Sequence, residues 1–353
     1  MNIRNVWRVL LILFIVVVTA LLAGCDNNDS NITSQKKPFT LAYIDQGWRL
    51  RIKHSMDGTS WTSAEGANPE TECVPGITAD DKGVMYLAVF RNAALQARFM
   101  MGLGPGIWDS SSRNVGDGHF GEIDSATSAV HVEGENWLVA YEHDNQAKVC
   151  EFSSRPGVRD FGNDVTPVSG VTNDNLVDRP AMVNRKGRLL ISWLMENKKV
   201  QLVTGNIVSG SPVWDAGYMF NVSETGYKEP EWALALAQDG ESFYLAIMRE
   251  KNPEPDQMLR EFTLFIYKSS DGLHWSKLTS RHLGARIRHA VCIAARSQND
   301  ILTIASSRLT TDILKFNGSS WTNIDYDTVF GDNALMGGYD LTLYVKETST
   351  SNE

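Results

Sequence analysis

Short apolar runs, each with a small residue near its centre, recur along the chain between residues 39 and 346. They are rich in β-branched and aromatic residues, and none continues into a sustained helical period, so each run predicts a buried strand. The runs are 39–44, 85–90, 137–142, 189–194, 243–248 and 302–307. Their central small residues are Ala42, Ala88, Ala140, Ser192, Ala246 and Ala305. Successive small residues are 46 to 59 positions apart, which predicts a repeated unit whose strands crowd toward an axis.

Each run has similar neighbours along the chain. A strand with a Gly or Asn turn precedes the later runs, at 126–134, 180–187, 232–240 and 289–299. A third strand follows them, at 147–152, 200–206, 262–267 and 312–316. An edge strand with a tryptophan often comes next, marked by Trp61, Trp108, Trp214, Trp275 and Trp321. A four-stranded unit of about 50 residues has the size of one propeller blade.

The first unit lacks its upstream strand, and the end of the chain, 338–345, offers one. Pairing of this segment with 39–44 would close a ring and remove the open sheet edges. The sequence therefore predicts an all-β fold: a six-bladed β-propeller of four-stranded blades over 39–346, closed by the C-terminal strand. The polar tail 347–353 predicts disorder.

The N-terminus has the pattern of a secretory signal: Arg4 and Arg8, then an apolar run, then Leu-Ala-Gly-Cys at 22–25. This ending resembles the lipobox of bacterial lipoproteins. The resemblance implies removal of 1–24, attachment of lipid such as palmitate to Cys25, and a membrane as partner through that lipid. An uncleaved transmembrane anchor is the alternative, because the apolar run is nearly long enough to span a bilayer.

The residues that follow Cys25 are polar and lack an apolar period, so 25–38 predicts a flexible tether. Asp26 comes directly after the cysteine. In enteric-type bacteria this resembles lipoproteins retained at the inner membrane. For a Gram-negative host we therefore expect a cell-membrane protein, lipid-anchored on the periplasmic face of the inner membrane.

Charge and cysteine content exclude several classes of function. The formal net charge is −9, and loss of two arginines with the signal would make it −11, which argues against nucleic acid as a partner. Cys73, Cys150 and Cys292 are not spaced as metal ligands, and we expect them to be buried. One disulfide among them is permitted, and the sequence does not decide which pair would form it. Because phosphate-binding glycine loops and paired histidines are missing, we expect no cofactor and no metal.

Two turns share a motif, SMDGTSW at 55–61 and SSDGLHW at 269–275, and NGSSW at 317–321 is a shortened relative. Ser and Asp side chains can bond nearby backbone amides, Gly supplies a positive φ, and Trp can pack between strands. The motif resembles the Asp-box, or BNR repeat, of sialidase-like β-propellers, with one residue fewer between Asp and Trp. In that family these boxes lie away from the active site, so the resemblance implies the fold and not the chemistry.

The resemblance also implies where chemistry would lie: where innermost strands begin and second strands end. A sialidase-type site has an arginine trio for a carboxylate, a Tyr–Glu nucleophile pair and an Asp general acid–base. The positions that match are Arg179 and Arg288 with Arg249 or Arg308, then Tyr227 with Glu231, and Asp124 or Asp340. Trp48 and His289 are further candidate ligand contacts. The Arg-Ile-Pro motif of the family is absent, and charged loop residues also serve solubility.

The functional prediction is a membrane-anchored envelope lipoprotein whose sialidase-like propeller binds a glycan or an envelope protein on its central face, with catalysis not established. The alternative is an exo-glycosidase of sialidase type that hydrolyses a carboxylated sugar. A glycosidase that uses two carboxylates, Glu229 or Glu231 with Asp124 or Asp340, is a further possibility.

Overall fold

The computed structural model describes most of residues 37–345. The described ranges are 37–66, 68–71, 75–92, 97–110, 112–114, 128–143, 146–154, 180–195, 198–230, 234–252, 260–285, 290–306, 310–331 and 341–345. All described residues belong to one compact unit, Lys36–Glu353. The predicted signal and Cys25 lie outside the described residues. Within the described ranges, no helix has the length and hydropathy needed to cross a bilayer.

Almost all regular structure in these ranges is β-strand, as the recurring apolar runs predict. The strands are β1 (Phe39–Ile44), β2 (Leu50–Ser55), β3 (Thr62–Ser63), β4 (Gly76–Ala79), β5 (Met85–Arg91), β6 (Ala97–Leu103), β7 (Arg113–Asn114), β8 (Ser128–Glu133), β9 (Asn136–His143), β10 (Gln146–Ser153), β11 (Ala181–Arg185), β12 (Arg188–Leu194), β13 (Val200–Val208), β14 (Ser211–Trp214), β15 (Tyr218–Phe220), β16 (Leu234–Gln238), β17 (Phe243–Glu250), β18 (Glu261–Ser269), β19 (Ser276–Ala285), β20 (Ala290–Ser297), β21 (Asp300–Ser306), β22 (Thr311–Phe316), β23 (Trp321–Ile324) and β24 (Leu341–Val345).

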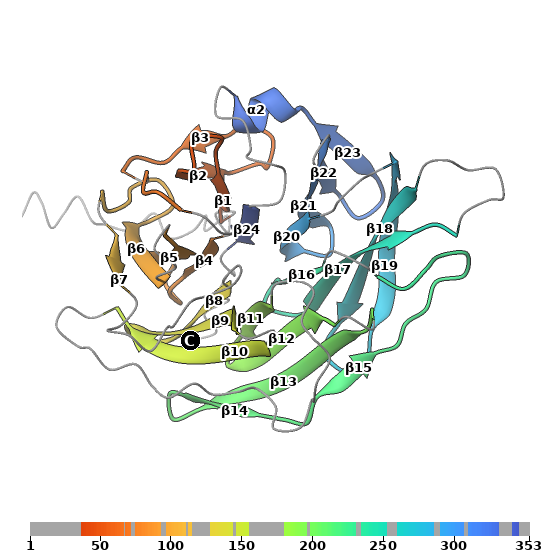
Figure 1. The fold of residues 1–353 in the computed structure, drawn as a ribbon, viewed down its shortest axis with the longest axis horizontal. Coiled ribbons are helices and arrows are strands. Elements are labelled where there is room, and N and C mark those ends of the chain that lie inside the picture. The colour runs from red at the N-terminus through yellow and green to blue at the C-terminus, as the bar shows by residue number, and fades with distance from the viewer. Residues whose placement is uncertain are drawn as a thin grey trace, which may run out of the picture. The chain divides into compact units, whose positions relative to one another are not determined.

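The strands form six antiparallel sheets around a ring, which confirms the six-bladed propeller (Figure 1). From the axis outward, blade 1 is β24-β1-β2-β3, blade 2 is β4 to β7, and blade 3 is β8 to β10 within the described residues. Blade 4 is β11 to β14 with β15 also paired to β13, blade 5 is β16 to β19, and blade 6 is β20 to β23. The innermost strands contact one another in the cyclic order β24, β4, β8, β11, β16, β20 and back to β24.

The ring closes through the C-terminal strand, as the sequence predicts. β24 pairs with β1 from Val345 opposite Phe39 to Leu341 opposite Tyr43. This register places Phe39, the start of a second strand, beside the end of an innermost strand. The same holds in blade 2, where β4 turns into β5. We call this side of the ring the bottom face, and the side where innermost strands begin the top face.

The core lies between adjacent blades, and the small residues of the repeated runs are buried in it. They do not occupy equivalent positions. Ala42 of blade 1 and Ala88 of blade 2 face each other across the same interface, and Ala246 and Ala305 do so between blades 5 and 6. The small residues therefore do not all lie on the same face of their blades. Each alanine instead leaves room for large partners such as Tyr86 in the same interface.

The two long turn motifs adopt the local geometry expected from their side chains. The Asp57 carboxylate accepts hydrogen bonds from the amides of Thr59 and Ser60, both at 2.7 Å. The Asp271 carboxylate accepts from the amides of Leu273 and His274 at 2.8 and 2.9 Å. Gly58 and Gly272, which follow these aspartates, have φ of 78° and 79°. Both turns lie on the bottom face.

The third turn uses an amide in place of the carboxylate. Asn317 Oδ1 accepts hydrogen bonds from the amides of Ser319 and Ser320 at 3.0 and 2.9 Å. The tryptophans that end the three motifs, Trp61, Trp275 and Trp321, are only partly buried. They cover the edge of the blades without entering the core, because they follow directly on exposed turn residues.

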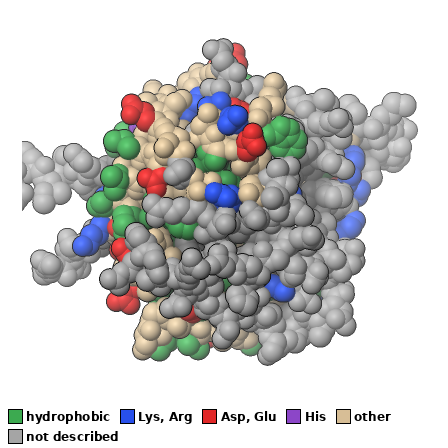
Figure 2. Space-filling view, turned by 60° about the vertical axis from the view of Figure 1, so that its left-hand side comes forward, with side chains coloured by type: hydrophobic (Ala, Val, Ile, Leu, Met, Phe, Trp, Pro, Cys, Tyr) green, Lys and Arg blue, Asp and Glu red, His purple; other side chains and the backbone are tan. Residues whose placement is uncertain are grey.

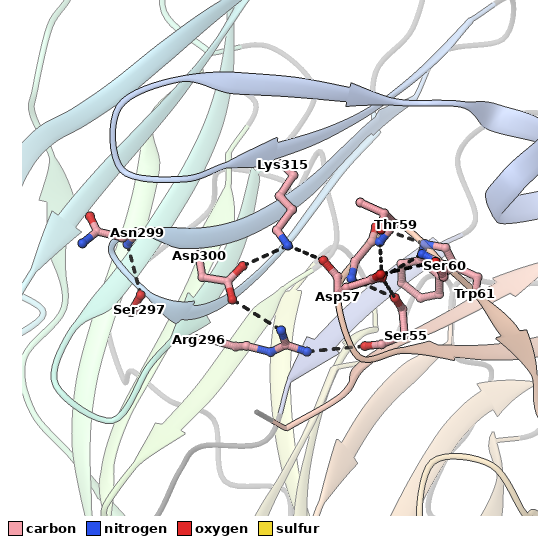
Figure 3. A network of polar contacts seen from close by, with 11 residues as sticks. Ser55, Asp57, Thr59, Ser60, Trp61, Arg296, Ser297, Asn299, Asp300 and Lys315 are labelled. Atoms are coloured by element: carbon pink, nitrogen blue, oxygen red, sulfur yellow. Dashed lines mark hydrogen bonds and ion pairs between the residues drawn. The ribbon is translucent and has the colours of Figure 1, made fainter. Parts of the chain in front are cut away.

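Blade 6 also holds the blade 1 turn from the side (Figure 3). Arg296 places its guanidinium 3.9 Å from the centre of the Phe39 ring and donates to the Ser55 carbonyl at 3.4 Å. Lys315 donates to the Asp57 carbonyl. Asp300 pairs with both bases, at 3.4 Å from Arg296 and 3.5 Å from Lys315. Polar side chains therefore strengthen the seam at which the two ends of the ring meet.

A short helix, α2 (Tyr326–Phe330), fills the same interface farther out and is not predicted by the periodicity. Asp325 caps it by accepting from the Thr328 amide at 3.1 Å. The helix buries Val329 and Phe330. Its last carbonyls are used by Lys53, whose Nζ lies 2.6 Å from the Val329 oxygen.

Candidate functional site

The β1–β2 turn on the top face presents an exposed aromatic side chain on a tightly bonded loop. Asp45 is only 5% exposed, and its Oδ1 accepts from the amides of Gly47 at 2.9 Å and Arg49 at 3.1 Å. Its Oδ2 accepts from Arg51 Nε at 2.6 Å. The carboxylate thus organises the turn from inside and leaves Trp48 outside.

Trp48 has a left-handed backbone, with φ of 57°, and is 45% exposed. Its amide donates to the Asp45 carbonyl at 3.0 Å, and its own carbonyl accepts from the Thr71 amide at 3.0 Å. A left-handed conformation costs a non-glycine residue about 1–2 kcal/mol. The local bonds offset that cost and hold the indole on the top face.

Charged residues lie next to the Trp48 backbone: Arg49 follows it directly, and Glu70 precedes Thr71, whose amide donates to the Trp48 carbonyl. Arg49 pairs with Glu70 as an isolated β-bridge, and Arg49 Nη2 lies 3.8 Å from Glu70 Oε1. Arg49 Nη1 also donates to the Asn68 carbonyl at 3.1 Å. Both charged side chains are largely open to solvent. A turn that carries an exposed apolar ring and, on the next residue, a guanidinium paired with a carboxylate can hold a ligand that has one apolar face and a rim of hydroxyl groups.

Arg249, a predicted ligand contact, is only 1% exposed and lies between blades 4 and 5. Its Nη2 donates to the Val222 carbonyl at 2.6 Å, and its Nη1 lies 3.5 Å from Glu229 Oε2. The guanidinium therefore anchors the connection from β15 to β16. Its proposed grip on a ligand carboxylate stays a prediction.

Tyr227, the predicted nucleophile, lies in the same connection and is partly buried. Its hydroxyl accepts a hydrogen bond from Thr263 Oγ1 at 3.3 Å, and its ring meets Phe265 edge-on with centroids 4.9 Å apart. Its intended partner Glu231 lies outside the described residues. Tyr227 thus contacts blade 5, while its catalytic role remains untested.

Glu250 is a buried acid that sequence reasoning missed. It is 4% exposed and accepts hydrogen bonds from Lys228 Nζ at 2.6 Å and Arg260 Nε at 2.7 Å. Burial acts to raise the pKa of Glu250, but the hydrogen bonds and charges of Arg260 and Lys228 outweigh it and lower that pKa. A carboxyl held ionised in this way anchors neighbouring chain and is unsuited to donating a proton. Lys228 lies in the preceding connection and Arg260 at the far end of the β17–β18 connection, so no short local pattern signals it.

An axial cavity of about 370 Å³ runs between the innermost strands. Its walls are the edges of β4, β8, β11, β16, β20 and β24. Polar side chains gather toward its bottom end: Asp81, His131, Asn184, Lys186 and Gln238. Neither Trp48 nor Arg249 lines it, so the described candidate residues and this cavity are separate features.

The remaining predicted site residues lie outside the described residues, so their grouping is untested. They are Asp124, Arg179, Glu231, Arg288, His289, Arg308 and Asp340. Cys150 and Cys292 are buried, and Cys73 lies outside the described ranges. Among the described residues, no group of three or more His, Cys, Asp or Glu side chains could hold a metal ion.

Known proteins resemble this chain in fold. No family model matches it, and no curated protein does. A fucose-specific lectin from Aleuria aurantia aligns with 82% of this chain and 91% of its own, at 13% identity and a TM-score of 0.52. An α-L-arabinanase from Penicillium chrysogenum, complexed with arabinobiose, aligns with 79% of this chain and 94% of its own, at 13% identity and a TM-score of 0.50. At this identity the likeness shows a shared six-bladed propeller fold alone.

Proposed function

We propose that this protein is a lipid-anchored glycan-binding propeller that binds sugar on its top face without cleaving it. The observation that carries the proposal is Trp48, an indole held exposed in a left-handed turn beside Arg49 and Glu70. The indole would stack on the apolar face of a sugar ring. The two charged groups would form hydrogen bonds with the hydroxyl groups of the sugar, as in small-molecule sites where a few polar groups fix the orientation of the ligand.

The position of Trp48 favours a role in binding over a role in folding. The corresponding turn of blade 4 has the same backbone bonds, from Met195 to Lys199 and from Lys198 to Met195, and Lys198 there has φ of 64°. The turn therefore does not require an aromatic residue. A large, exposed aromatic side chain at a strained backbone position is typical of a functional site.

Among the described residues, the buried acid Glu250 does not favour hydrolysis. A glycosidase needs a carboxylic acid with a raised pKa to protonate the leaving group. The described carboxyl groups whose pKa clearly departs from its ordinary value, Asp57, Asp271 and Glu250, are all lowered. The fucose-specific lectin has the same fold, which agrees with sugar binding. The arabinanase has it too, so hydrolysis is the alternative outcome of the test.

The test compares Trp48→Gly and Trp48→Ala in the Lys36–Glu353 unit on a glycan array, beside fluorogenic glycosides. The exposed part of the indole is on the order of 100 Å². Covering it stabilises a complex by about 2 kcal/mol, or roughly thirty-fold in affinity. Both variants should lose this affinity. Lys198→Gly is the matched control, since it makes the same backbone change on the same face, and it should bind as the parent protein does.

Stability measurements separate binding from folding in the same variants. Both substitutions at Trp48 remove the ring, but only glycine also relieves the left-handed strain. The free energy of unfolding should therefore be about 1 kcal/mol higher for Trp48→Gly than for Trp48→Ala. Unchanged glycan binding in both variants would reject Trp48 as the site. Turnover of a glycoside would reject the lectin function in favour of the exo-glycosidase.

The location at the membrane is the last part of the proposal. Lipid on Cys25 would anchor the protein, on the periplasmic face of the inner membrane in a Gram-negative host, where a glycan or an envelope protein is its ligand. Cys25→Ser should abolish incorporation of labelled palmitate. Asp26→Ser should move the protein to the outer-membrane fraction, and recovery of the parent protein in that fraction would contradict the inner-membrane address.

A further inference from the structure

Three large apolar side chains project from the bottom face of blade 2. Leu103 is 72% exposed, Ile107 is 59% exposed and Val84 is 55% exposed. They belong to two joined turns, because the Gly104 amide donates to the Val84 carbonyl at 2.8 Å and the Leu103 amide to the Ile107 carbonyl at 2.9 Å. We call Val84, Leu103 and Ile107 the blade 2 patch. Figure 2 brings the left-hand side of the ring in Figure 1 forward and shows hydrophobic side chains along one edge, among charged ones.

The turns that carry the patch are well ordered by their own bonds. Buried Asp80 accepts from the Val84 amide at 2.7 Å, and Trp108 donates from Nε1 to the Pro105 carbonyl at 3.1 Å. The blade 1 residue Glu65 accepts from the Trp108 amide at 2.9 Å. Because these bonds fix the backbone, the patch cannot fold inward. Exposed apolar groups rimmed by polar residues mark surfaces for a membrane or a partner.

The chain enters the propeller on this same face and beside this blade. Phe39, the first residue of β1, lies at the bottom of blade 1, and blade 1 packs directly against blade 2. Only twelve positions separate Cys25 from Lys37, the first described residue. Fully extended, such a segment reaches at most about 40 Å. A lipid on Cys25 would therefore hold the point where the chain enters, at the bottom of blade 1, within about 40 Å of the bilayer.

We infer that the blade 2 patch docks on the lipid bilayer that holds the anchor. The inference rests on the lipid anchor of the proposed function. Val84, Leu103 and Ile107 would enter the interface between headgroups and acyl chains. The top face, with Trp48, would then point away from the membrane and stay open to a large glycan.

The chemistry of the patch fits an anchored contact with lipid. Asp81 and Lys82 precede it and cancel in charge, so attraction to anionic headgroups is weak. Three apolar side chains bind a bilayer weakly by themselves. A lipid anchor makes the contact intramolecular and raises the effective concentration of membrane, so a small patch suffices.

The experiment measures contact of single positions with lipid. The full chain, with Cys73→Ser and Ile107→Cys labelled by an environment-sensitive dye, is reconstituted into vesicles of phosphatidylcholine and phosphatidylglycerol with brominated acyl chains. Val208→Cys is the matched control, since Val208 is 53% exposed and flanks the turn between the third and fourth strands of blade 4 on the same face. We expect bromine to quench the dye at 107 and to leave the dye at 208 unchanged.

A second pair of variants tests the patch without moving the dye. Leu103→Ser should reduce the quenching at 107, whereas Leu273→Ser, in the equivalent turn of blade 5, should not. Flotation with the vesicles but no quenching at 107 would overturn the docking and leave the anchor standing. Failure to float would overturn the anchor, and the docking with it. Equal quenching at 107 and 208, or cross-linking between copies through position 107, would also overturn the inference.

Discussion

Asp271→Asn tests how charge holds the blade 5 turn on the bottom face. The carboxylate accepts two hydrogen bonds from backbone amides, those of Leu273 and His274. It also accepts one hydrogen bond from the Ser269 hydroxyl at 2.9 Å and lies 2.7 Å from His274 Nδ1. Asparagine keeps an oxygen for the two amides, as Asn317 does in blade 6. It loses the charge and the acceptor that faces His274. Hydrogen bonds to an ionised group are about twice as strong as neutral ones. We therefore expect unfolding to become easier by about 1 kcal/mol at neutral pH, since the turn is partly solvated.

The effect should depend on pH in a defined direction. Burial acts to raise the pKa of Asp271, but the hydrogen bonds from His274 and Leu273 outweigh it and hold that pKa well below its ordinary value. The stability from this carboxylate is therefore complete above an unfolded-state pKa of about 4 and is lost as pH falls through the lower folded value. Acidification should thus destabilise the parent protein more than Asp271→Asn, and the two proteins should converge.

Urea unfolding followed by tryptophan fluorescence at pH 7, 5 and 3 measures this difference. Asn317→Asp is the opposite control, because it places a carboxylate in the neutral turn and should add stability that acid removes. A difference between the parent protein and Asp271→Asn that stays constant down to pH 3 would show that the charge of Asp271 does not stabilise the turn.

Two further substitutions probe the blades. Arg296→Met should lower the free energy of unfolding by about 2–4 kcal/mol, because it leaves Asp300 poorly paired at the seam and removes the cation from the Phe39 ring. Lys315→Met should lower it less in the same urea titration, because the Lys315 side chain is more exposed than that of Arg296. Trp275→Ala should lower the free energy of unfolding by about 2–3 kcal/mol, less than loss of a fully buried tryptophan would, since the Trp275 ring is partly exposed. Glycan binding at constant temperature should remain unchanged. Loss of binding in a stably folded variant would show that this turn contacts ligand.

Much of the fold is encoded in local patterns. Short apolar runs rich in β-branched and aromatic residues predict the second strands, and turn residues predict where each strand ends. Asp and Gly in the SMDGTSW and SSDGLHW motifs determine turns whose bonds span only two or three residues, so no distant contact is needed to form them. Pairing of Leu341–Val345 with Phe39–Ile44 follows from the one unit that lacks an innermost strand.

Other features depend on contacts between segments far apart in the chain. A shift of one residue in a strand reverses the face that it shows, so Ala42 and Ala88 came to face each other although they lie at similar places in their runs. Arg249 lies near the end of a strand, and the connection from blade 4 covers it through a hydrogen bond to the Val222 carbonyl. The same connection supplies Lys228 to Glu250.

The sequence alone determined the repeat, the blade count, the closing strand and the turn chemistry, because each depends on residues close together or on a regular spacing. Only the tertiary structure decided which polar side chains are exposed. It left Trp48 open on one face, buried Arg249 between blades, and placed Leu103 and Ile107 on the face where the chain enters. Those outcomes depend on how six sheets pack around an axis, and that packing is set by interfaces that no single stretch of the chain contains.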